Sequence, residues 1–306
     1  MIRAITRTYV RPRMGTLLAA TLPVSESHVD ARYLDVVFQT ASSCDGVMSR
    51  HRRDTDLSRL NALAGDRDGL LAPELARILA QARALAEATD GAFDPTVTPV
   101  SEVWRRAARV SRLPSRRRVR AALAMVGWKH IDVRGPRVAL ARPGMAVDLG
   151  AFGKGLSLDH ITARLREEGC SSALLNFGES SLAAIGRPRR GRWMIVLRHP
   201  MGGFVGTFPL GDRACSTSGS FGQTLRIGAR QVSHVVDPRT GRPAREMAQV
   251  TVLARSGAVA EAASTALLVL GRSALDDVAR RLDVDACWID RSGVYTTPWF
   301  RLQAAA

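Results

Sequence analysis

The residues best suited to chemistry are an aspartate and a lysine set among three glycines. The segment from Val147 to Gly155 reads V-D-L-G-A-F-G-K-G, with Asp148 at the end of an apolar run and Lys154 near its close. Glycines let a backbone approach a ligand and adopt positive φ. A helix that follows such a turn offers N–H groups and positive partial charge to a phosphate. The segment predicts a phosphate-binding turn; the alternative is a plain strand-to-helix turn with a surface lysine.

The spacing of these glycines excludes the two common phosphate loops. A P-loop requires G-x-x-x-x-G-K-[ST], and Gly155 stands where Ser or Thr would bind magnesium. The dinucleotide fingerprint G-x-G-x-x-G fails because two residues separate Gly150 from Gly153. Magnesium ligands at this turn must therefore come from elsewhere in the chain.

A second candidate pair consists of Glu261 and Thr265 in an alanine-rich segment. Residues four apart share one face of a helix. Carboxylate and hydroxyl oxygens are ligands that Mg²⁺ accepts. The pair predicts a cation site, and the alternative is a solvated glutamate beside a packed threonine.

Four further polar segments punctuate the chain. An Asp-Pro turn lies in 91–97, polar residues end a strand at 176–180, and a histidine opens the dense polar segment 234–241. The small-residue turn at 217–220 lacks the G-x-S-x-G elbow, which disfavours a serine hydrolase.

The elements that must position these groups are read from hydrophobic periodicity. The spacing predicts helices over 27–48, 73–89, 104–125, 156–168, 259–270 and 273–282. Strands are predicted over 14–23, 173–176, 182–185, 193–197, 204–210, 250–254, 287–290 and 294–297. Because strands and helix pairs alternate without strict βαβ repetition, the pattern favours an α+β fold with mixed, mainly antiparallel sheets flanked by helices. We expect a single domain over residues 1–306, helix-rich to about residue 170 and strand-rich after it.

Charge, aromatic content and cysteine spacing disfavour several classes of partner and cofactor. Lys plus Arg outnumber Asp plus Glu by 44 to 28, a net charge of +16. The arginines are scattered in short clusters, such as 116–118 and 187–190, and aromatics make up only 5%, which disfavours nucleic acid as a partner. The four cysteines form no C-x-x-C, which argues against zinc and a disulfide framework. With no span-length apolar segment and no visible signal peptide, we expect no stable membrane insertion and a cytoplasmic protein. A periplasmic or membrane-anchored form would require an N-terminal signal missing from this sequence.

Taken in order, these segments resemble those of the ApbE family of FAD:protein FMN transferases. The matching segments run from residue 14 to about residue 271, nearly the whole chain: 14–16, 54–61, 93–97, 148–155, 176–178, 217–219, 234–241 and 265–267. The resemblance implies a two-lobed, T-fold-like α+β architecture. It also implies that FAD is cleaved at its pyrophosphate, that FMN is esterified to a Thr or Ser of an acceptor flavoprotein, and that AMP leaves.

The resemblance further implies roles for individual residues. Mg²⁺ would be held by the backbone carbonyl of Ala151 with Glu261 and Thr265. His234 would act in catalysis together with Lys154. The implied contacts to FAD are Met14, His51, Ala92, Phe93, Asp94, Thr96, Asp148, Lys154, His234 and Val235.

Three positions depart from the family pattern. Glu261 stands where Asp is usual, Glu179 and Ser180 replace the Gly-Asp of a Gly-Gly-Asp pattern, and His51 replaces an aromatic residue. Two alternatives therefore accompany the transferase: a Mg²⁺-dependent FAD pyrophosphatase that gives FMN and AMP, and a non-catalytic FAD-binding protein.

Overall fold

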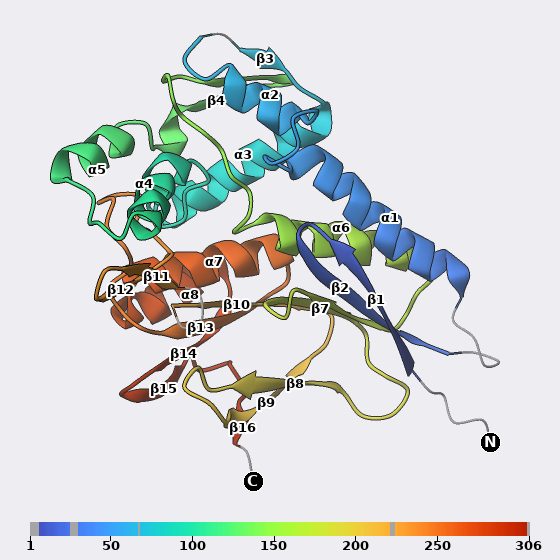
Figure 1. The fold of residues 1–306 in the computed structure, drawn as a ribbon. Coiled ribbons are helices and arrows are strands. Elements are labelled where there is room, and N and C mark those ends of the chain that lie inside the picture. The colour runs from blue at the N-terminus through green and yellow to red at the C-terminus, as the bar shows by residue number, and fades with distance from the viewer. Residues whose placement is uncertain (1–5, 25–29, 67, 221–223, 305–306) are drawn as a thin grey trace.

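An eight-stranded sheet forms the centre of the molecule (Figure 1). The computed structural model describes residues 6–24, 30–66, 68–220 and 224–304. Within them every strand pair is antiparallel. In spatial order the strands are β1 (Thr6–Arg13), β2 (Thr16–Pro23), β6 (Ala173–Phe177), β7 (Ser181–Ile185), β10 (Ala214–Gly219), β13 (Gln249–Ala254), β14 (Asp285–Asp290) and β15 (Gly293–Thr296).

Two helices, α6 (Gly153–Glu167) and α7 (Gly257–Leu270), lie along one face of this sheet. The helix α1 (Ala31–Met48) packs on α6, and α8 (Leu275–Leu282) packs on α7 after the short turn η2 (Arg272–Ala274). Ala263 and Leu267 of α7 pack toward the sheet, while Ala262 and Ala266 pack toward the helices above. A helix buried on both sides at close range needs small residues, which explains its alanine-rich sequence.

A helical layer covers α6 and α7 from above (Figure 1). It contains α2 (Asp56–Ala62), α3 (Pro73–Ala88), α4 (Thr98–Arg109), α5 (Arg116–Leu123), η1 (Trp128–His130) and a small sheet of β3 (Gly69–Leu70), β5 (Arg137–Leu140) and β4 (Ile131–Arg134). The apolar face of α3 is buried in the hydrophobic core of this helical layer.

The opposite face of the large sheet is covered by a second small sheet. It consists of β8 (Trp193–Arg198), β9 (Phe204–Leu210) and β16 (Gln303–Ala304). Trp193 and Phe208 of this sheet, with Phe300 from the segment before β16, pack on Leu182 and Cys215 of the large sheet. The hairpin of β11 (Thr224–Ile227) and β12 (Arg230–Ser233) stands apart and packs against α4.

The helices α6 and α7 approach each other at two glycines. A Cβ atom on Gly155 would lie 2.1 Å from the carbonyl oxygen of Gly257, so only glycine fits there. The Asp159 carboxylate then accepts hydrogen bonds from the backbone N–H groups of Gly257 and Ala258, at 2.6 and 3.1 Å. Burial raises the pKa of Asp159, and these donors oppose the shift. The N-terminus of α7 is thus fixed directly to α6.

The α+β class with antiparallel sheets is confirmed. The helix expected over 104–125 is instead two helices, because the chain breaks after Arg109 and Ser115 caps α5 anew. The strand β1 was not predicted, since its side chains at the sheet edge are mostly exposed and lack apolar alternation. The last helix, expected from residue 273, begins at Leu275. Residue 27, where the first helix was expected to begin, lies outside the described residues.

All four cysteines are buried as free thiols. Burial raises the pKa of Cys44 and Cys170, and raises the pKa of Cys215 and of Cys287 to about 12. Among the described residues, no helix combines the length and the apolar character that crossing a membrane requires.

Candidate functional site

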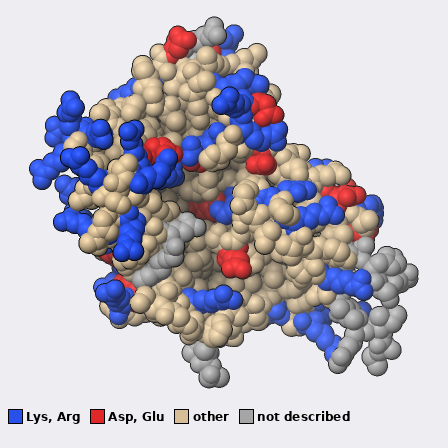
Figure 2. Space-filling view, viewed as in Figure 1, with Lys and Arg blue, Asp and Glu red and all other residues tan. Residues whose placement is uncertain are grey.

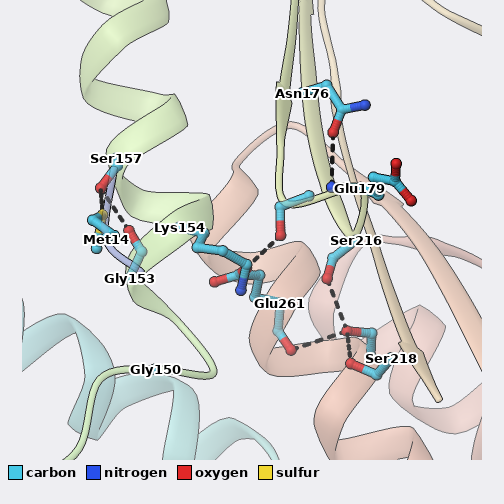
Figure 3. Close-up of polar contacts among 12 residues, drawn as sticks. Met14, Gly150, Gly153, Lys154, Ser157, Asn176, Glu179, Ser216, Ser218 and Glu261 are labelled. Carbon is cyan, nitrogen blue, oxygen red and sulfur yellow. Dashed lines mark hydrogen bonds and ion pairs between the residues drawn. The ribbon is translucent and has the colours of Figure 1, made fainter. Parts of the chain in front are cut away.

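A buried carboxylate with one unsatisfied oxygen marks the site. The Lys154 ammonium lies 2.8 Å from Oε1 of Glu261, and Ser181 donates a hydrogen bond to the same oxygen (Figure 3). The Glu261 side chain is 4% exposed. Its other oxygen, Oε2, is buried and has no hydrogen-bond partner among the described residues. An oxygen left in this state is costly unless a cation or donor satisfies it.

The glycine segment brings Lys154 to this carboxylate. The helix α6 begins at Gly153, so Lys154 stands in its first turn. Before it, Asp148 accepts a hydrogen bond from the N–H of Gly150 at 2.8 Å and pairs with Arg50 at 2.7 Å. None of the three glycines has a positive φ, so a left-handed backbone conformation is not the reason for glycine at these positions. At Gly155 the reason is the close packing of α6 on α7.

The tip of the first hairpin reaches the same helix. Met14 and Gly15 connect β1 and β2 with φ values of 47° and 72°, and a positive φ is unusual for Met. The Ser157 hydroxyl lies 3.3 Å from the Met14 sulfur and 2.7 Å from the Gly153 carbonyl oxygen (Figure 3). The turn therefore places Met14 beside the start of α6.

The segment 92–96 is a buried support for the glycine loop. Asp94 accepts hydrogen bonds from the backbone and hydroxyl of Thr96 at 2.8 and 2.6 Å, and from the Trp128 N–H at 2.9 Å. Burial raises the pKa of Asp94, against these donors. The side chains of Ala92, Phe93, Asp94 and Thr96 are all at most 6% exposed.

Two contacts connect this support to the glycine loop. The Asp148 N–H donates to the Pro95 carbonyl at 2.8 Å. The rings of Phe93 and Phe152 are 6.2 Å apart. The Asp-Pro turn therefore fixes the loop that carries Lys154.

His234 follows β12 directly and is half-buried. The next residue, Val235, packs on the core between α7 and the sheet. The segment that follows is held to the helical layer, since the Trp104 indole donates to the Gly241 carbonyl at 2.9 Å. His51 is exposed and adjoins Arg50, Ala151 is exposed in the glycine loop, and Thr265 is half-buried one turn after Glu261.

Sequence reasoning missed three contributors to this site. Ser181 lies one residue after the polar segment 176–180. It reaches Glu261 because the β6–β7 hairpin reverses the chain at this point. Arg50 joins Asp148 and Glu102, which are distant in the chain. Ser264 hydrogen-bonds with both Ser216 and Ser218, so the small-residue segment expected as a turn is instead the end of strand β10, anchored to α7 (Figure 3).

The surface around these groups is hollowed. Figure 2 shows a depression between the helical layer and the sheet, with acidic and basic side chains at its floor. A separate cavity of about 620 Å³ adjoins the β1–β2 turn. Its walls are Pro12, Arg13, Met14, Gly15, Thr16, Leu17, Ser42, Asp45 and Arg52, so Met14 is the predicted site residue that it includes.

A lysine in the first turn of a helix can bind an anion, and a buried carboxylate oxygen without a partner can accept a cation. The chain belongs to the ApbE family, whose sequence profile matches residues 14–288.

The relatives and neighbours of this chain carry consistent names. It is 32% identical to a FAD:protein FMN transferase of Rhodobacter capsulatus over 82% of this chain, and spans about half (49%) of that relative's length. It is 27% identical to the FAD:protein FMN transferase of Escherichia coli K12, over 95% of this chain and 86% of the relative. The apo flavinyl transferase ApbE of Pseudomonas stutzeri superposes with a TM-score of 0.84 at 26% identity, covering 97% and 96% of the two chains.

Proposed function

We propose that this protein transfers FMN from FAD to a Thr or Ser hydroxyl of an acceptor flavoprotein, with Mg²⁺, and releases AMP. The observation that carries the proposal is the unsatisfied Oε2 of Glu261 beside the Lys154 ammonium. The names of the relatives support the reaction class. We further propose that residues 1–306 act as one functional unit.

The donor set fits a hard cation. Oε2 of Glu261, the Thr265 hydroxyl one turn later and the Ala151 carbonyl would hold Mg²⁺, which accepts oxygen ligands. Bound there, Mg²⁺ would neutralise charge on the FAD pyrophosphate. The Ser181 hydroxyl donates to the other oxygen, Oε1, and so helps to orient the carboxylate.

The remaining predicted contacts divide into two groups. Lys154, Asp148, Met14 and His51 have side-chain atoms at or near the surface and are proposed to touch FAD directly. Ala92, Phe93, Asp94, Thr96 and Val235 are proposed to shape its site through backbone groups, since the first four side chains are buried.

Lys154→Met tests the ion pair. Removing the ammonium leaves the Glu261 carboxylate buried without its cation, a change worth about 3–5 kcal/mol for fully buried pairs. We expect less than this, because the Lys154 side chain is 23% exposed. Thermal unfolding in EDTA should show a lowered Tm, and FAD titration should show weaker binding.

Addition of Mg²⁺ should recover part of that lost Tm, because the ion then neutralises Glu261. Lys129→Met, which removes an ammonium lying over the Trp128 ring, is the matched control and should leave FAD affinity unchanged. Equal FAD affinity in Lys154→Met and the unaltered protein would contradict the assignment.

His234→Ala tests the base. If His234 accepts the proton of the acceptor hydroxyl, its loss affects the chemical step, which general bases accelerate about 10²–10⁴-fold. We expect FAD affinity to persist while transfer, followed by flavin fluorescence on the acceptor, falls by that range. His199→Ala in the β8–β9 connection is the control. A variant that transfers normally at saturating FAD would make His234 a ligand contact only.

Mass spectrometry of Thr- and Ser-containing acceptors incubated with FAD and Mg²⁺ tests the function as a whole. Transfer adds FMN to the acceptor through a phosphoester and releases one AMP for each FMN transferred. AMP and FMN formed at a rate that ignores the acceptor would establish the pyrophosphatase instead. FAD that binds and stays intact would establish the non-catalytic binder.

A further inference from the structure

A dense group of arginines covers α4, α5 and the turn between them. Residues 98–125 contain eight arginines and one acidic residue, Glu102. Figure 2 shows this blue surface over α4 and α5, beside the central depression. We call it the arginine surface, and its exposed arginines are Arg106, Arg109, Arg112, Arg116, Arg117, Arg118 and Arg120.

Folding does not explain this concentration of charge. Three arginines occupy the first turn of α5, where the positive end of the helix dipole disfavours cations. The ion pairs that the described residues supply from this segment are those of Arg105 and Arg109, and both use Glu102. Like charges brought together at the start of a helix destabilise it, so a binding partner is the natural compensation.

Apolar side chains lie within the same surface. Val110 is 61% exposed and Leu113 is 44% exposed, and both belong to the connection between α4 and α5. Arginine mixed with apolar area is typical of protein–protein contacts, where Arg is enriched among the residues that dominate binding. A surface for single-stranded nucleic acid would present aromatic stacking platforms instead.

The arginine surface borders the segment that carries His234. The helix α4 packs against β11, whose hairpin partner β12 ends one residue before His234. A Cβ atom on Gly241 would lie 2.9 Å from Val119 of α5 and 3.6 Å from Val100 of α4. Both helices therefore pack on the segment 234–241 at Gly241, and a protein bound to them would contact the same part of the molecule as this segment.

We propose that the arginine surface docks an acidic segment of the acceptor protein, adjacent to the Thr or Ser that receives FMN. This inference rests on the proposed function and adds the charge of its protein substrate. Acidic side chains would neutralise the first turn of α5, and Val110 and Leu113 would bury against apolar residues between them. Charge complementarity of this kind mainly accelerates encounter and falls with ionic strength.

A charge-swap experiment tests the docking. Three Thr-containing peptides differ only in residues flanking the Thr, which are Asp/Glu, Asn/Gln or Lys. The full chain with FAD and Mg²⁺ is compared with R116E/R117E/R118E and with R187E/R189E/R190E. The second variant makes the same charge change in the exposed β7–β8 connection, on the opposite side of the molecule from α5 (Figure 1).

For the unaltered protein and the control variant, we expect kcat/KM to favour the acidic over the neutral peptide by about 10-fold or more at low salt. The preference should shrink as salt rises. R116E/R117E/R118E should lose the preference and gain one for the Lys peptide, through KM and with unchanged kcat and FAD affinity.

Equal transfer to all three peptides, or an equal effect of the two variants, overturns the docking and leaves the transferase standing. Binding of anionic phosphatidylserine vesicles or of duplex DNA that depends on Arg116–Arg118, without any peptide preference, overturns it in favour of that partner. Absence of transfer to every peptide while FAD remains bound and intact overturns the proposed function, and the docking with it.

Discussion

Glu261→Gln is expected to reduce flavin transfer by about 10²-fold or more, the effect of losing several kcal/mol of charge stabilisation at the pyrophosphate. The amide keeps the volume of the side chain and can still accept a hydrogen bond from Ser181. It removes the charge that Oε2 would offer to Mg²⁺ and that Lys154 pairs with through Oε1. The structure therefore predicts a loss of metal affinity with little change in packing.

Two measurements separate this loss from misfolding. In the absence of FAD, Mg²⁺ should raise the Tm of the unaltered protein and fail to raise that of Glu261→Gln. Glu261→Asp restores the usual residue of the family and should retain the Mg²⁺ response. Glu179→Gln is the matched control, because its carboxylate is exposed and turned away from Glu261 (Figure 3). A Mg²⁺ response in Glu261→Gln equal to that of the unaltered protein would exclude this residue as a metal ligand.

Gly155→Ala should destabilise the protein by at least about 3 kcal/mol, the upper range for overpacking. The added methyl would stand 2.1 Å from the Gly257 carbonyl oxygen, a backbone atom that can move only with its helix. Separation of α6 from α7 would also loosen the hydrogen bonds from α7 to Asp159. In a chain of 306 residues, this free energy lowers the Tm by about 5 °C.

Gly46→Ala provides the opposite control. Gly46 lies within α1, and a Cβ atom there would meet nothing within 4 Å. Alanine favours the helix over glycine by up to about 1 kcal/mol, so this variant should be more stable. Comparable stability of the two alanine variants in thermal unfolding would show that the α6–α7 contact tolerates a side chain.

The glycine segment shows both the reach and the limit of the sequence. Glycines followed by helical spacing were enough to place Lys154 at a helix start. The sequence could not show why Gly155 is glycine, because Gly155 packs against Gly257, about 100 residues away in the chain. A local sequence pattern predicts local geometry. The close approach of α6 to α7 depends on Gly257, which lies outside that pattern.

Glu261 also has contacts that the sequence could not predict. Its spacing from Thr265 predicted a shared helix face, which the single helix α7 confirms. That one carboxylate oxygen is occupied by Lys154 and Ser181 depends on three elements meeting. The hairpin between β6 and β7 sets Ser181, and its turn places Glu179 at a φ of 58°. Glycine adopts such a φ without strain, so the structure shows why the family pattern has Gly at the position of Glu179.

Because all four cysteines are buried, we expect thiol reagents to react poorly with the native protein. Burial raises the pKa of all four thiols and shields them from solvent, so the reactive thiolate is disfavoured at pH 7. A fluorophore or spin label attached to a cysteine introduced on exposed Ala121 of α5 would therefore report from one position, without prior removal of native thiols. Spectroscopic distance measurements between the helical layer and the sheet therefore need only introduced cysteines, because the native thiols would stay unlabelled.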